Sequence, residues 1–206
     1  MLSFRPGHLR APYALPQALQ ATGYRYSSSV TANNSLTHLP FRLMHDRGVA
    51  AASGIFEFPV SVEDEEAPAL GTRLPQALKL ARSLERYGAC MVLLIHTDRA
   101  GDKLEFERKF IQAVSKNAWV GAFDEFGPWW AARDGVTLDV DSDPASGRHT
   151  LRLQAPQSIR GLSLELPARW RLAAAQAAGV NAVQTGRRLL LAEARGAVEV
   201  VFQTAP

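Results

Sequence analysis

The sequence predicts an α/β fold over residues 1–135, followed by a small β-rich, sandwich-like region over residues 136–206. The α/β prediction comes first from a run of five apolar residues, 91–95, which is typical of a strand buried on both faces of a parallel sheet. It comes also from the alternation of strand-like and helix-like segments up to residue 135. After Gly135 short segments, most of them flanked by proline or glycine, indicate strands.

The N-terminal segments begin this alternation. Residues 14–21 can form a short helix, because Leu15 and Leu19 lie four apart on one face, and Gly23 ends it. Residues 24–29 then predict a strand that enters a polar loop.

Residues 30–54 are expected to form a long irregular loop. His38 and His45 lie in it seven residues apart, whereas a metal-binding pair on a helix is usually three or four apart. We therefore interpret both as loop histidines. Residues 55–60 alternate and predict a strand that ends at Pro59.

Three helices are predicted after this strand. Residues 73–87 carry apolar side chains on one face, and Gly88 ends the helix. Residues 103–117 form the second helix, with Asp102 as its N-cap. Residues 125–133 form the third, which we expect to pack against the sheet.

The C-terminal region contains several short strand candidates and one other element. Its alanine-rich residues 173–178 predict a helical turn. The strand candidates are residues 136–140, 149–153, 162–166, 189–191 and 198–202.

The composition excludes some partners. The net charge is +3 with scattered arginines, and no basic stripe with interleaved aromatic residues favours nucleic-acid binding. The acidic run 63–66 is interpreted as a solvated loop. No run approaches the roughly 18 apolar residues of a membrane span, and no signal peptide is evident, so we expect a cytoplasmic protein that does not enter membranes. Cys90, the only cysteine, is interpreted as a small core residue.

His96 is the first candidate site residue, because it follows directly after the apolar run 91–95. In α/β folds, ligands bind beyond the carboxyl ends of parallel strands. An imidazole at that edge titrates near neutral pH and could give a proton to a leaving group. The alternative is a histidine at a strand end that hydrogen-bonds only the backbone.

Three stretches in order resemble the polysaccharide deacetylases of the NodB-homology type, carbohydrate esterase family four. Residues 4–7, Phe-Arg-Pro-Gly, are similar to the family's Arg-Pro motif and precede a Gly-Tyr-Arg-Tyr-Ser-Ser-Ser strand, in which Ser27 stands where the family commonly has aspartate. Residues 56–59 are similar to its Glu-x-Pro strand, and residues 94–96 match its Leu-x-His motif. The resemblance covers about residues 4–133.

This resemblance implies a partial, distorted (β/α) barrel and a metal-dependent cleavage of sugar N-acetyl groups. By position, His96 would be the general acid that protonates the departing amine, Leu94 would line the acetyl pocket, and Arg5 would orient a catalytic aspartate. The expected substrate is a polysaccharide or another N-acetylated glycan. Trp129 and Trp130 could stack on its sugar rings, although such residues also serve as packing.

The sequence departs from the family at the metal site. It contains neither the Asp-Asp motif nor the His-x-x-x-His motif that supply the base and the metal ligands. A catalytic zinc needs about three protein ligands. We therefore expect no metal in this chain, which looks like the C-terminal part of a deacetylase, and expect zinc only in a full-length homologue.

Two functions follow as hypotheses. The first is a polysaccharide deacetylase-like protein that is inactive as this chain. The alternative is a non-catalytic carbohydrate-binding or assembly module. A half barrel would expose strand edges, so we expect either a homodimer or an open edge covered by residues 30–54.

Overall fold

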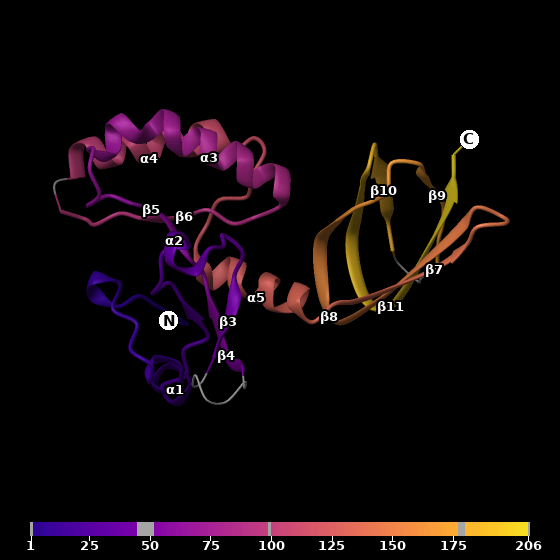
Figure 1. Ribbon diagram of the computed structural model, residues 1–206, viewed down its shortest axis with the longest axis horizontal. Helices are drawn as coiled ribbons and strands as arrows, with labels where there is room; N and C mark the ends of the chain where they lie inside the picture. The colour runs from indigo at the N-terminus through magenta and orange to yellow at the C-terminus, as the bar shows by residue number, and fades with distance from the viewer. Residues whose placement is uncertain (1, 45–51, 99, 177–179, 206) are drawn as a thin grey trace. The chain divides into compact units, whose positions relative to one another are not determined.

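The computed structural model describes residues 2–44, 52–98, 100–176 and 180–205. Two compact units divide the chain, Met1–Gly127 and Pro128–Pro206 (Figure 1). The boundary lies inside helix α5 (Phe123–Asp134) and not at residue 135, because Trp129 and Ala132 already pack into the β-rich core. Within the described ranges, no helix combines the length and apolar character needed to cross a membrane.

The first unit is built on short parallel strands, as predicted. Strands β1, β2 and β4 run parallel, with β3 antiparallel on the far side of β4, and a second parallel pair joins β5 to β6. A parallel bridge between Thr31 and Val60 links the two groups of strands. The strands are β1 (Ser3–Phe4), β2 (Tyr26–Ser27), β3 (Phe41–Met44), β4 (Ala52–Glu57), β5 (Val60–Glu63) and β6 (Val92–Leu94).

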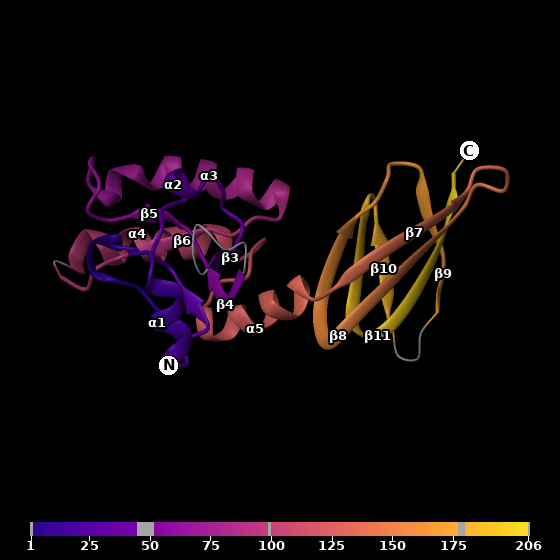
Figure 2. The same cartoon turned by 60° about the horizontal axis from the view of Figure 1, so that its bottom comes forward.

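Strand β6 has apolar contacts on both faces, which confirms the central sequence prediction. Leu93 packs toward the cluster built on Phe106 and Phe110, while Val92 and Leu94 alternate to the other face and are buried. Helices α3 (Leu74–Tyr87) and α4 (Ala100–Val114) run beside β5 and β6 and supply that cluster (Figures 1 and 2).

Helix ends agree in part with the sequence. Gly88 ends α3 in the left-handed conformation at φ 63°, where an L side chain would be strained. Helix α4 begins at Ala100, so the prediction that Asp102 is its N-cap is wrong; Asp102 lies in the first turn, where its charge still complements the helix dipole. Short helical segments complete the unit: η1 (Gly7–Leu9), α1 (Leu15–Ala21), α2 (Ala32–Ser35) and η2 (Leu70–Arg73).

The expectation of an irregular loop over residues 30–54 is wrong over much of its length. It contains α2, β3 and the start of β4, because backbone pairing between β3 and β4 stabilises segments whose local sequence is not strand-like. Thr31 caps α2 by accepting a hydrogen bond from the Asn34 N–H at 3.3 Å. His38 lies between α2 and β3, and His45 lies outside the described residues.

The second unit is one five-stranded antiparallel sheet in the order β10-β11-β8-β7, with β9 also paired to β11. Its two long strands contain Gly161 and Gly196, which have positive φ angles of 69° and 67°, and the register between these strands shifts between Ala194 and Gly196. The strands are β7 (Thr137–Asp143), β8 (Arg148–Glu165), β9 (Trp170–Gln176), β10 (Ala182–Thr185) and β11 (Arg188–Thr204).

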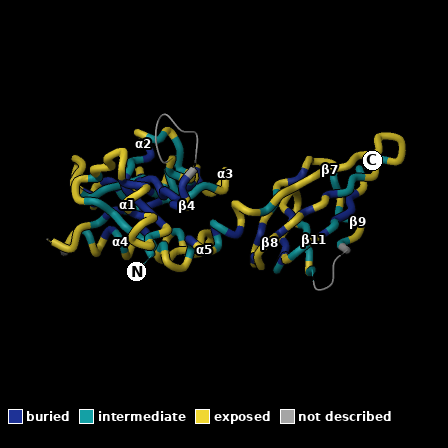
Figure 3. Tube along the Cα trace, turned by 90° about the horizontal axis from the view of Figure 1, so that it is seen from below, coloured by how far each residue is buried: buried dark blue, intermediate teal, exposed yellow. Residues whose placement is uncertain are grey.

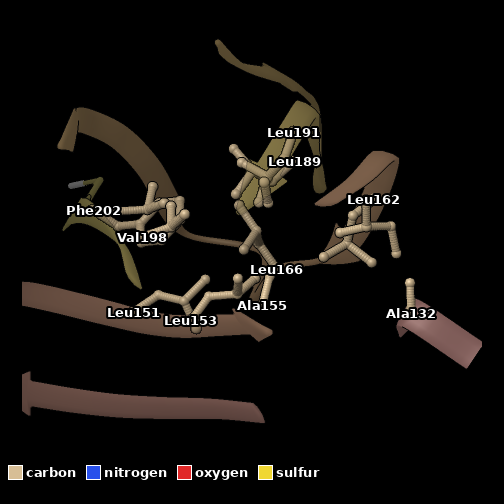
Figure 4. Packing of buried hydrophobic residues seen from close by; sticks show 13 residues of the cluster. Ala132, Leu151, Leu153, Ala155, Leu162, Leu166, Leu189, Leu191, Val198 and Phe202 are labelled. Atoms are coloured by element: carbon tan, nitrogen blue, oxygen red, sulfur yellow. The ribbon is translucent and has the colours of Figure 1, made fainter. Parts of the chain in front are cut away.

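Both ends of the long strands contribute to a single core, so a bent sheet replaces the expected sandwich of separate short strands. Figure 4 shows Leu151 and Leu153 of β8 and Leu189 and Leu191 of β11 around this core. The predicted helical turn at 173–178 is wrong where it is described, because β9 pairs with β11 there. Strand β7 is exposed along its whole length (Figure 3).

The whole chain is therefore mixed α/β, and none of the sheets formed by its described residues closes into a barrel.

Gly127 lies in the part of α5 that belongs to the first unit, next to the ring of Tyr26, and a substitution there tests how tightly this part of the helix packs. A Cβ atom at this position would collide with the ring of Tyr26, which is only 3% exposed. We expect Gly127→Ala to lower the free energy of unfolding by about 1–3 kcal/mol, as overpacking does in well-packed cores. Urea unfolding measures the change.

Gly101→Ala is the matched control, because a Cβ there meets nothing within 4 Å and lies in helix α4. The control is expected to keep or raise stability. Equal stability of Gly127→Ala and the unmodified protein would contradict the tight contact.

Candidate functional site

Polar side chains follow the parallel strands of the first unit in two separate groups, one after β1, β2 and β4 and the other after β5 and β6. Arg5 follows β1, Ser28 follows β2, and Glu57 is the last residue of β4. Asp64 follows β5, and His96 lies two residues beyond β6. In α/β folds ligands bind beyond the carboxyl ends of parallel strands, which makes the Asp64–His96 group the candidate site and the Arg5 group a second candidate binding region.

Asp64 and His96 form a carboxylate–imidazole pair. Asp64 Oδ1 lies 2.8 Å from His96 Nδ1, and Asp64 Oδ2 accepts a hydrogen bond from the His96 backbone N–H at 3.0 Å. The Asp64 side chain has no exposed surface, whereas 47% of the His96 side chain is exposed. An ionised carboxylate can only accept, so Nδ1 carries a hydrogen and Nε2 is left to exchange a proton with a ligand.

Lys103 joins this pair from the first part of α4. Its Nζ lies 2.6 Å from Asp64 Oδ2 and 2.9 Å from Asp98 Oδ1, and it donates to the His96 carbonyl oxygen at 3.4 Å. Glu65 contributes a further carboxylate 3.9 Å from His96 Nδ1. Asp64 is thus held by a cation on one side and by an imidazole on the other.

These contacts set the charge states of the pair. Burial by itself would raise the pKa of Asp64, but hydrogen bonds from Lys103 and from the His96 ring and backbone outweigh it and lower the pKa to about 2. The hydrogen bond to Asp64 raises the pKa of His96, while the Lys103 charge acts in the opposite direction. At neutral pH the carboxylate is ionised, and the imidazole holds its proton more readily than a free histidine does.

Arg5 is anchored to the strand ends by serine and backbone oxygens. Its Nη2 donates to Ser28 Oγ at 2.8 Å and its Nε donates to the Ser28 carbonyl oxygen at 3.2 Å. Ser28 Oγ in turn donates to the Phe58 carbonyl oxygen at 2.8 Å. The resemblance assigned an aspartate to Arg5; among the described residues, its hydrogen bonds go to Ser28.

Glu57 is a second buried carboxylate, at the end of β4, and it binds backbone N–H groups. Its Oε1 accepts from the Ser29 N–H at 2.6 Å and from the Val30 N–H at 2.9 Å. Burial raises the pKa of Glu57, while the Ser27 side chain, the two N–H groups and the nearby Arg5 charge act to lower it. Glu57 therefore fixes the segment after β2 that anchors Arg5.

Aromatic rings surround Arg5. Phe58 is 1% exposed, and its ring centroid lies 5.0 Å from Phe123 and 6.1 Å from Phe126. Trp119 stacks on Phe126 at 5.5 Å and remains 57% exposed. Arg5 lies over Phe123, with Cζ 5.9 Å from the ring centroid. An exposed indole and a guanidinium therefore belong to one group of contacts.

The predicted site residues do not all meet. Arg5 and His96 both follow parallel strands, but no contact between described side chains joins them. Leu94 is 7% exposed and lies at the end of β6. Trp130 is 4% exposed, and Trp129 donates its Nε1 hydrogen to the Arg160 carbonyl oxygen at 2.7 Å. These tryptophans are placed as packing residues, and their contact with a sugar stays a prediction.

Three residues of the site escaped the sequence analysis. The sequence pattern puts Asp64 in a solvated acidic run and Lys103 at the start of a predicted helix, without a role in a site. Glu57 was noticed only as part of a motif. The position of Asp64 directly after an alternating segment could have indicated a strand-end carboxylate, but no local pattern predicts its contact with His96, which is 32 residues away.

Metal ligands are not grouped in the part of the first unit that the structure describes. Within the part of the chain that the structure describes, no cluster of three or more His, Cys, Asp or Glu side chains could hold a metal ion. Asp64 and His96 are bound to each other, and the Lys103 ammonium takes the position beside Asp64 that a cation would need. These residues do not fit a zinc site.

Comparison with known proteins adds no family to this geometry. No protein-family model matches the chain, and the search of curated proteins finds no match. The contacts at the strand ends are therefore the basis for a functional proposal.

The low pKa of Asp64 predicts acid sensitivity. Its pKa of about 2 lies below its ordinary value of 3.8, so ionised Asp64 stabilises the folded state above pH 4, and this contribution is lost as the pH falls toward 2. The shift corresponds to about 2 kcal/mol. We expect Asp64→Asn to be less stable at pH 7 and to have a flatter stability profile between pH 4 and pH 2.

Urea unfolding at several pH values, followed by the NMR signals of β6, measures this profile. Asp102→Asn is the control, because Asp102 is exposed in the first turn of α4. A steep acid profile that survives in Asp64→Asn would contradict the assignment.

Proposed function

We propose that the first unit is polysaccharide deacetylase-like and carries the proton-donor part of a site for the N-acetyl amide bonds of a glycan, while this chain by itself does not turn over substrate. The observation that carries this proposal is the Asp64–His96 pair at the end of a parallel strand, with Nδ1 held at 2.8 Å and the ring half exposed. The resemblance of residues 94–96 to the Leu-x-His motif supports the same role. A partial (β/α) barrel as the fold of the first unit is part of this proposal.

In this role His96 acts as a general acid. After water has added to the acetyl carbon, protonated His96 would give its Nε2 proton to the sugar nitrogen as the C–N bond breaks and the C=O bond of the released acetate re-forms, and His96 would be left as neutral imidazole. Asp64 keeps Nδ1 protonated and fixes the ring plane. The raised pKa of His96 increases the fraction of imidazolium that is available near neutral pH.

The residues around Arg5 could bind the sugar. Arg5 and the exposed Trp119 indole offer hydrogen bonds and an apolar ring surface, which are the groups that bind the polar and apolar faces of sugars. Leu94, Trp129 and Trp130 remain candidates from the resemblance. Since the described residues do not form a zinc site, no step of the proposal uses a metal.

Binding of an N-acetylated glycan tests the proposal. We expect N-acetylated chito-oligosaccharide to cause saturable NMR shifts in the His96 ring and in backbone residues 94–98, because the sugar amide would lie at Nε2. Cello-oligosaccharide, which lacks the N-acetyl group, should cause smaller shifts.

His149→Ala is the matched control for His96→Ala, because both nitrogens of His149 are already within 2.8 Å of hydroxyl oxygens in the second unit. Only His96→Ala should change the response. Shifts confined to residues 136–206 would favour a carbohydrate-binding module instead, and a lack of any saturable shift would oppose both functions.

Metal content and turnover test whether the chain lacks the ligands of a zinc site. We expect metal analysis to find no stoichiometric zinc and an acetate assay to find no release from acetylated chito-oligosaccharide, because a site needs about three ligands from the chain. About one tightly bound zinc per chain would show that the ligand argument is wrong.

A further inference from the structure

Lys103 is placed where a buried carboxylate needs a permanent counter-charge. Its Nζ lies 2.6 Å from Asp64 Oδ2, and only 14% of the Lys103 side chain is exposed, against none of the Asp64 side chain. The same ammonium contacts the His96 carbonyl oxygen at 3.4 Å and Asp98 at 2.9 Å. One side chain of α4 thus binds three groups around the imidazole.

We propose that Lys103 is a positioning residue of this site, which keeps Asp64 ionised and directed at His96 whether or not the imidazole carries a proton. Its importance for catalysis rests on the proposed function, but its effect on the pair does not. Lys103 itself contacts no proposed reacting atom.

The argument follows from what happens when His96 gives its proton away. The neutral imidazole then leaves Asp64 as a carboxylate without exposed surface, and a buried charge without a partner is strongly destabilising. Lys103 remains charged and removes most of this penalty. Without Lys103 the imidazolium would be the only cation on Asp64, so His96 would release its proton less readily.

The other charged groups near the ring do not replace Lys103. Glu65 and Asp98 are carboxylates, and their side chains are 66% and 67% exposed. Both would add to the attraction for a proton on His96. Among the described residues around this ring, Lys103 is the cation that acts against it.

The titration of the His96 ring in the full chain tests the inference without a substrate. In Lys103→Met we expect the pKa of His96 to rise above its value in the unmodified protein, and in Lys103→Arg to return toward that value. Lys109→Met is the matched control on the same helix, because Lys109 pairs at the surface with Glu105 and not with Asp64. NMR of the ring protons gives each pKa.

An unchanged or lowered pKa of His96 in Lys103→Met would overturn the proposal, as would an equal change in Lys109→Met. The backbone N–H of His96 reports in the same spectra whether Asp64 stays in place, since it donates to Asp64 Oδ2. Loss of that N–H signal in Lys103→Met together with recovery in Lys103→Arg would support the positioning role. None of these measurements depends on glycan binding. A failed glycan titration would therefore count against the proposed function and not against the role of Lys103.

Discussion

The candidate site depends on how the protein compensates one buried carboxylate. Asp64 has no exposed side-chain surface, yet its pKa is lowered to about 2 because Lys103 and His96 surround it with hydrogen-bond donors. An isolated charge in this position would cost several kcal/mol. The cation, the carboxylate and the imidazole are therefore interdependent, and α4, β5 and β6 must all be in place for the pair to form.

The buried charge of Glu57, at the end of β4, is compensated in a different way. Its Oε1 receives two backbone N–H groups from Ser29 and Val30, while burial still raises its pKa. This carboxylate stabilises a loop, and through Ser28 it places Arg5. Asp64 instead sets the charge of an exposed side chain, so the two buried acids have distinct tasks: one fixes the backbone and the other tunes an imidazole.

Sequence reasoning succeeded where local pattern and burial agree. The apolar run around Leu93 indicated β6, and Gly88 indicated the end of α3, because a positive φ and a two-faced strand have strong local signatures. It failed where pairing partners decide the conformation. Alanine-rich residues 173–176 favour helix locally but pair with β11, and β3 and β4 stabilise each other within residues 30–54.

The sequence by itself determined the parallel character of the first unit and the position of His96 at a strand end. These features depend on hydrophobic periodicity and turn residues, which are local. Only the tertiary structure decided that Asp64 and Lys103 meet at His96, and that Trp130 is buried while Trp119 is exposed. Contacts between residues far apart in the chain have no local signature, because they arise from strand order and helix packing.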